Sequence, residues 1–147
     1  MQDATEGRRR AVGGATTAAA ALRVLLVDDT SHVRVMLREM LSLDGFDVVA
    51  DTGDPLEVND LARAHDPRVV VMDLKMPGID GLEATRRLVA ERPDQIVVLY
   101  TAFLDAEVAE RARAAGAALC LEKVDGLPHL EQELGRLAAL HQAPDLG

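Results

Sequence analysis

The chain has 147 residues and a formal net charge of −9, with 48% hydrophobic and 28% charged residues. This length fits one domain with short tails and leaves little room for a second hydrophobic core. The acidic balance argues against a nucleic-acid-binding surface, which needs clustered Lys and Arg. A single cysteine, Cys120, excludes an internal disulfide and fits a reducing cytoplasm. No apolar run reaches the length of a membrane span, so we expect a cytoplasmic protein.

The first 21 residues are predicted to form a disordered tail. The stretch RRRAVGGATTAAAA loosely mimics an export signal, with basic residues before a weakly apolar run. Arg23 interrupts that run, and glycine and threonine dilute it, so we interpret the stretch as a low-complexity tail. The predicted folded domain covers residues 22–140, and residues 141–147 form a second tail.

From residue 22 onwards, apolar segments of strand type alternate with segments of helical periodicity. The first strand is predicted in RVLLVDD at 23–29, and the helix after it ends before Gly45. A second strand follows in FDVVAD at 46–51. The next helix is expected to begin with Asp54 as N-cap and Pro55 at its first position.

The second half of the chain continues the alternation. RVVVMD at 68–73 is the third predicted strand, and GLEATRRLVAER at 81–92 is the third helix. QIVVLYT at 95–101 is the fourth strand, and an Ala-rich helix at 105–116 ends in glycine. AALCLEK at 117–123 is the fifth strand. The last predicted helix carries four leucines on one face: Leu127, Leu130, Leu134 and Leu137.

Five strand–helix units with short connections predict a doubly wound α/β fold. The strands are apolar on both faces, which is typical of a parallel sheet covered by helices on both sides. In this class of fold, ligands bind outside the carboxyl ends of the strands, where the strand order reverses.

Polar residues stand at four of those carboxyl ends. Asp28 and Asp29 end the first predicted strand, Asp73 the third, Thr101 the fourth and Lys123 the fifth. Each alone has an ordinary explanation, such as a helix cap, a turn residue or a solvated charge. With strand order 2-1-3-4-5 they all surround one crevice, which favours a functional site.

The charges of this set indicate a divalent cation. Two carboxylates about 4 Å apart repel by roughly 4 kcal/mol at an effective dielectric near 20. Mg²⁺ and the Lys123 ammonium together balance three carboxylates, and Mg²⁺ favours oxygen ligands in sites shared with phosphate. Cation, hydroxyl and ammonium also suit a phosphoryl group in transfer, with Asp73 as the nucleophile that forms an acyl phosphate.

Four stretches resemble the signature blocks of bacterial response-regulator receiver domains: VLLVDD, VVVMDLKMPGIDGLEATRRL, VVLYTA and CLEK. The resemblance covers residues 22–140 and implies a flavodoxin-like, five-stranded sheet in the order 2-1-3-4-5 with five helices. It also implies that Asp28, Asp29 and Asp73 bind Mg²⁺, together with the backbone carbonyl of Lys75.

The same resemblance implies how the site works. Asp73 would be phosphorylated by a sensor histidine kinase or phosphotransfer protein, Thr101 would hydrogen-bond the phosphate and Lys123 would pair with it. The domain would catalyse only its own phosphorylation and dephosphorylation. It would bind a downstream protein through its fourth helix, fifth strand and fifth helix, as a monomer or a phosphorylation-dependent dimer.

Three residues depart from the family pattern. Val124 follows the lysine where many receivers have Pro, and Cys120 stands where receivers usually have a switch aromatic. Phe103 lies two residues after Thr101, where its bulk would slow loss of the phosphate.

Other functions stay open beside the leading one, a stand-alone phosphoacceptor switch. Cys120 motivates a degenerate receiver that serves as an interaction module, although the intact acidic set counts against it. The chain could also be the receiver half of a longer DNA-binding regulator. Two classes of enzyme fit the sequence less well. An aspartate-nucleophile phosphatase generally has a second acid two residues after the nucleophile, where this chain has Lys75. A dinucleotide enzyme needs a glycine-rich turn, where this chain has VDDTSH.

Overall fold

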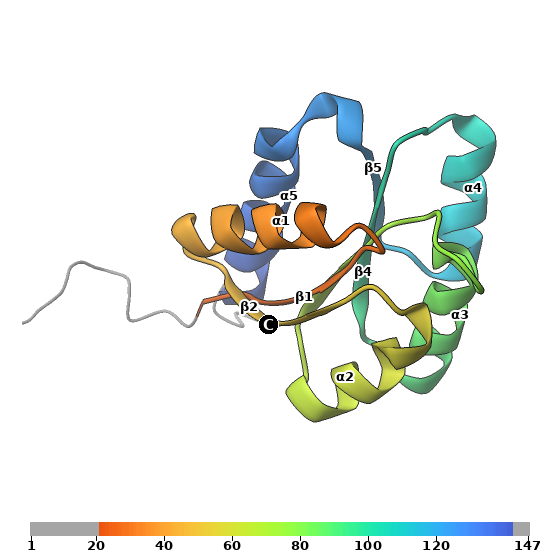
Figure 1. Cartoon of the computed structure of the whole chain (residues 1–147), viewed down its shortest axis with the longest axis horizontal. Helices are drawn as coiled ribbons and strands as arrows, with labels where there is room; N and C mark the ends of the chain where they lie inside the picture. The colour runs from red at the N-terminus through yellow and green to blue at the C-terminus, as the bar shows by residue number, and fades with distance from the viewer. Residues whose placement is uncertain (1–20, 143–147) are drawn as a thin grey trace, which may run out of the picture.

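The computed structural model describes residues 21–142 (Figure 1). Most of the two predicted tails lies outside these residues, although the last helix includes residues 141 and 142. The strands are β1 (Arg23–Val27), β2 (Asp47–Thr52), β3 (Val69–Met72), β4 (Ile96–Thr101) and β5 (Leu119–Glu122). The helices are α1 (Ser31–Leu43), α2 (Val58–His65), α3 (Gly81–Glu91), α4 (Ala106–Ala115) and α5 (Leu127–Gln142). Two short 3-10 helices, η1 (Pro55–Glu57) and η2 (Lys123–Asp125), precede α2 and α5.

The five strands form one parallel sheet in the order β2-β1-β3-β4-β5, so the predicted fold class and strand order are confirmed. Helices α1 and α5 cover one face, and α2, α3 and α4 cover the other (Figure 1). Alternate residues of β1 supply the two cores, because side chains along a strand point to opposite faces. Leu25 and Val27 pack with α2 and α3, whereas Val24 and Leu26 pack with α1 and α5.

Helix capping follows the sequence signals. Asp54 accepts a hydrogen bond from the backbone N–H of Leu56 with Pro55 next to it, as predicted. The turn that it begins is the 3-10 helix η1, and α2 continues from Val58. At the C-terminal end of α4, Gly116 has a φ of 106° and ends the helix in the left-handed conformation that glycine tolerates best.

The start of α3 lies directly against the carboxyl end of β3. The N–H of Gly81 donates to the carbonyl of Leu74 at 2.6 Å. A Cβ atom on Gly81 would lie 2.9 Å from the Cα of Leu74 and closer still to the carbonyl oxygen of Asp73. Only glycine therefore allows the helix to approach the residue that follows β3.

Within the described residues, no helix is both long and apolar enough to cross a membrane.

Candidate functional site

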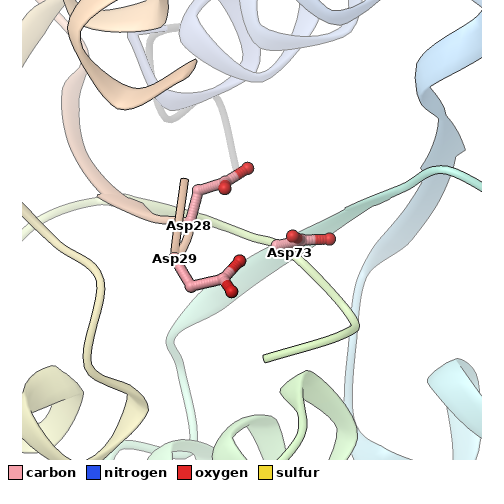
Figure 2. A group of neighbouring side chains, drawn as sticks. All are labelled: Asp28, Asp29 and Asp73. Atoms are coloured by element: carbon pink, nitrogen blue, oxygen red, sulfur yellow. The ribbon is translucent and has the colours of Figure 1, made fainter. Parts of the chain in front are cut away.

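Three carboxylates meet at the carboxyl edge of the sheet (Figure 2). One oxygen each from Asp28, Asp29 and Asp73 lies within 4.8 Å of the others. Asp28 and Asp29 follow β1, and Asp73 follows β3, the neighbouring strand. Asp28 is buried, Asp73 is partly buried and Asp29 is exposed, so the group opens to solvent on one side.

The backbone fixes where these acids stand. The N–H of Asp73 donates to the carbonyl of Val27 at 2.8 Å, which aligns the ends of β3 and β1. The N–H of Asp28 donates to the carbonyl of Thr52 at 3.0 Å, which ties the same point to β2. The Asp28 side chain accepts from the N–H of Thr30 at 2.9 Å, so the chain turns there into α1.

Lys123, the first residue of η2 directly after β5, brings a positive charge to the acids. Its Nζ lies 3.1 Å from Asp28 Oδ2 and 3.6 Å from Asp73 Oδ1. The ammonium also stands 5.8 Å from the centroid of the Tyr100 ring, within reach of a cation–π attraction. Burial would lower the pKa of Lys123, but the hydrogen bond to Asp28 and the charges of Asp73 and Asp28 outweigh it and raise the pKa.

The pKa of Asp73 reflects its burial and the crowding of negative charge in the cluster. Burial raises the pKa of Asp73, the Lys123 charge lowers it in part, and the charge of Asp28 raises it further. The backbone amides of Leu74 and Lys75 favour the ionised form by hydrogen bonding. Lys123 alone therefore leaves the acids short of positive charge.

The donor set fits a divalent cation such as Mg²⁺. Three carboxylates and one ammonium leave two negative charges, which one such ion neutralises. Carboxylate oxygens are hard ligands, and the open side leaves space for water or phosphate oxygens. Lys75 follows two residues after Asp73, and its carbonyl as a further ligand stays a prediction.

Thr101 ends β4 with a buried side chain. Its hydroxyl donates to the carbonyl of Phe103 and accepts from the N–H of the same residue, both at 3.3 Å. The N–H of Leu104 donates to Glu122 of β5 at 3.3 Å. These contacts hold the β4–α4 connection, so the Thr101 hydroxyl is engaged within its own loop in this structure.

The departures from the family pattern have clear positions. Cys120 is half-buried against the core that α2, α3 and α4 cover, and burial raises the pKa of its thiol. The residue therefore behaves as a small hydrophobic group, since a reactive cysteine needs a lowered pKa. Phe103, in the β4–α4 connection, is 60% exposed, and Val124, in η2, is 79% exposed.

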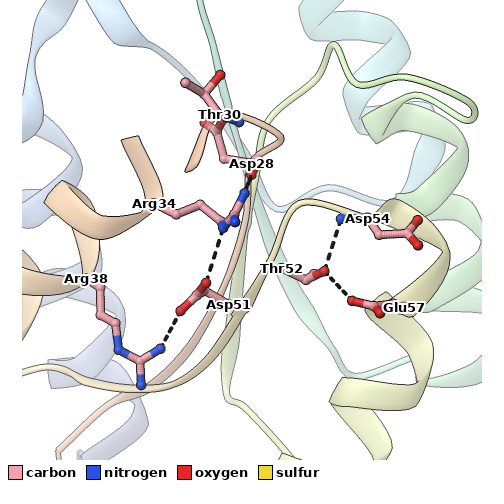
Figure 3. A network of polar contacts seen from close by, with 8 residues as sticks. All are labelled: Asp28, Thr30, Arg34, Arg38, Asp51, Thr52, Asp54 and Glu57. Atoms are coloured by element: carbon pink, nitrogen blue, oxygen red, sulfur yellow. Dashed lines mark hydrogen bonds and ion pairs between the residues drawn. The ribbon is translucent and has the colours of Figure 1, made fainter. Parts of the chain in front are cut away.

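Sequence reasoning missed a second layer of polar residues, which contacts the backbone of Asp28 (Figure 3). Arg34 of α1 donates to the backbone carbonyl of Asp28 at 2.6 Å and to Asp51 of β2 at 3.2 Å. Arg38 pairs with the other oxygen of Asp51. The available signal was the spacing of the two arginines four residues apart on one helix face.

The family model described as the response regulator receiver domain matches residues 24–134. The chain belongs to the response regulator receiver family. This places the chain among the phosphoacceptor domains of two-component signalling.

Relatives of this receiver domain are longer proteins. The transcriptional regulatory protein PdtaR of Mycobacterium tuberculosis is 41% identical over 130 residues, which are 84% of this chain and 63% of PdtaR. The response regulator GacA of Pseudomonas aeruginosa is 41% identical over 121 residues, 80% of this chain and 56% of GacA. This receiver therefore spans less than two thirds of the curated relatives that it matches.

Solved structures share the receiver's fold. A LuxR-family two-component response regulator from an Aurantimonas species has a TM-score of 0.78 and 32% identity, covering 82% of this chain and 86% of that one. The signal receiver domain of the response regulator NarL from Mycobacterium tuberculosis has a TM-score of 0.74 and 27% identity, covering 80% and 96%.

Proposed function

We propose that Asp73 accepts a phosphoryl group from a sensor histidine kinase or a phosphotransfer protein, in a reaction that depends on Mg²⁺. The observation that supports this most is the meeting of three carboxylates from β1 and β3 with the Lys123 ammonium. Asp28 and Asp29 then serve as ligands of the cation, with Asp73 and the backbone carbonyl of Lys75.

The chemistry is a transfer between two nucleophiles. A carboxylate oxygen of Asp73 forms a bond to phosphorus while the bond from phosphorus to the donor's imidazole nitrogen breaks, and the imidazole leaves with a proton from solvent. Bound Mg²⁺ supplies positive charge for the phosphoryl oxygens. Lys123, 3.6 Å from Asp73, pairs with the phosphate that forms there.

Thr101 joins the site only after its hydroxyl changes partner. A hydroxyl has one proton to donate, and here that proton goes to the carbonyl of Phe103. Once the phosphate is present on Asp73, the hydroxyl donates to a phosphoryl oxygen instead. The β4–α4 connection then rearranges, which changes the face formed by α4, β5 and α5 that a downstream protein binds.

The proposed oligomeric state is either a monomer or a dimer that forms on phosphorylation. The net charge of −9 opposes contact between this domain and nucleic acid.

A second candidate is the receiver part of a longer transcriptional regulator. The observation that favours it is the coverage of PdtaR and GacA, of which this chain spans 63% and 56%. The phosphoacceptor chemistry is the same in both cases, and only the route of output differs.

Intact mass spectrometry tests the proposal directly. The protein and Asp73→Asn are incubated with a small-molecule phosphodonor and Mg²⁺, with and without EDTA. We expect one added phosphate on the wild type alone, and none with EDTA. No adduct on the wild type, combined with no binding of beryllofluoride, would favour a degenerate interaction module.

A further inference from the structure

Arg34 points from α1 toward the backbone of Asp28 and the side chain of Asp51 (Figure 3). Its side chain is 20% exposed. Its Nη1 donates to the backbone carbonyl of Asp28 at 2.6 Å, and its Nε donates to Asp51 at 3.2 Å. The guanidinium therefore joins α1, the end of β1 and β2 at one point.

Two further residues hold Arg34 there. Asp51 accepts from Arg34 with one carboxylate oxygen and from Arg38 with the other, so the acid is fixed from two positions of α1. Gly53 leaves the space for the guanidinium, because a Cβ atom on it would lie 2.6 Å from Nη1 of Arg34. Gly53 does not have a positive φ, so glycine is needed at this position for space and not for backbone conformation.

The carbonyl that Arg34 binds belongs to the peptide between Asp28 and Asp29. That peptide is planar, so fixing its oxygen also fixes where the chain leaves Asp28 and enters Asp29. The Asp28 side chain has its own contacts, to the N–H of Thr30 and to Lys123. The Asp29 side chain is exposed, so its direction depends on this peptide more than on packing.

We propose that Arg34 is a positioning residue that holds the Asp28–Asp29 peptide in the geometry a divalent cation requires. Asp51 and Gly53 support it. The inference rests on the proposed function, since it concerns the residues proposed to bind Mg²⁺.

Geometry and charge make opposite predictions for Arg34. Removing a positive charge near three carboxylates strengthens the field that attracts Mg²⁺, so a purely electrostatic role predicts tighter binding in Arg34→Ala. Loss of positioning predicts weaker binding, since residues that orient metal ligands are typically worth about 10–100-fold in affinity. The direction of the change in Kd therefore separates the two roles.

The test measures Mg²⁺ affinity by isothermal titration calorimetry, with far-UV circular dichroism as the control for folding. Gly53→Ala displaces the guanidinium while it keeps the charge, and Arg38→Ala removes a charge that touches Asp51 but not Asp28. We expect Kd to rise on the order of 10-fold in Arg34→Ala and Gly53→Ala. Arg38→Ala should raise Kd less than Arg34→Ala does, because Arg34 keeps its own bonds to Asp28 and Asp51, and Arg34→Lys should recover part of the loss.

The amount of phosphorylated protein as a function of Mg²⁺ gives a second reading. In Arg34→Ala the Mg²⁺ concentration for half-maximal phosphorylation should rise, while saturating Mg²⁺ restores most of the adduct. Unchanged or tighter Mg²⁺ binding in both Arg34→Ala and Gly53→Ala would overturn the positioning role of Arg34 and leave the proposed function intact. If Arg34→Ala does not fold, Gly53→Ala decides. A wild type that binds no Mg²⁺ would overturn the proposed function, and the inference with it.

Discussion

The contact between α3 and the residue after β3 allows a quantitative test with Gly81→Ala. A Cβ atom on Gly81 meets the carbonyl oxygen of Asp73 and lies 2.9 Å from the Cα of Leu74. Both partners are backbone atoms, which cannot move away by changing a rotamer. The start of α3, the Asp73 carbonyl or both must shift.

The expected magnitude follows from two opposing effects. Alanine is favoured over glycine inside a helix by about 1 kcal/mol, which is an upper limit for Gly81 because it is the first residue of α3. Overpacking against a rigid neighbour costs typically about 1–3 kcal/mol, and contact with backbone belongs to the upper part of that range or beyond it. We expect Gly81→Ala to lower the free energy of unfolding by about 1–3 kcal/mol. For a domain of this size each kcal/mol shifts Tm by roughly 3–6 °C.

Gly135→Ala is the matched control. Gly135 lies inside α5, and a Cβ atom there would have open space. Only the helix effect remains, so this variant should gain about 0.5–1 kcal/mol. Urea denaturation followed by far-UV circular dichroism measures both variants, since the chain has no Trp to report by fluorescence. If Gly81→Ala is as stable as the wild type or more stable, the close approach does not constrain α3 and the reasoning is refuted.

Three further outcomes follow from the site. Mg²⁺ at roughly 100 times its Kd should stabilise the wild type by about 2.7 kcal/mol in thermal denaturation, and Asp29→Asn should lose most of this gain. Tyr100→Leu should lower the pKa of Lys123 in an NMR titration, because the ring that favours the ammonium is lost, whereas Tyr100→Phe should leave it unchanged. Phe103→Ala should speed the loss of phosphate in a mass-spectrometric time course while changing stability by less than about 0.5 kcal/mol, since Phe103 is 60% exposed. An equal decay rate would show that Phe103 does not shield the acyl phosphate.

Most of the fold could be predicted from the sequence, because its signals are local and repeated. Strands apolar on both faces and helices with one apolar face determine a parallel sheet between two layers. The strand ends were less accurate: β1 ends at Val27, two residues before the predicted end. Asp28 still donates its N–H to Thr52, but its side chain accepts from Thr30, so the ladder gives way to a turn there.

The first layer of the site followed from the strand order, since residues at carboxyl ends of parallel strands share one edge. The second layer did not. An arginine on a helix is normally read as a solvated charge, and nothing local shows that Arg34 reaches Asp51, 17 residues away. The engagement of Thr101 by Phe103 also depends on a rotamer, which sequence patterns do not specify.

The hydrogen bonds of the β4–α4 connection bear on the basal output that the proposed switch would have without phosphate. Two hydrogen bonds must be released for the connection to rearrange, from Thr101 to the carbonyl of Phe103 and from the N–H of Leu104 to Glu122. Each contributes about 0.5–1.5 kcal/mol, which places the rearranged conformer a few kcal/mol above the resting one. A gap of that size leaves the minor state at roughly 0.1–10% of the molecules. Under the proposed rearrangement, the basal output of the switch, and with it the dynamic range that phosphorylation can add, is therefore set by two hydrogen bonds of the unphosphorylated protein.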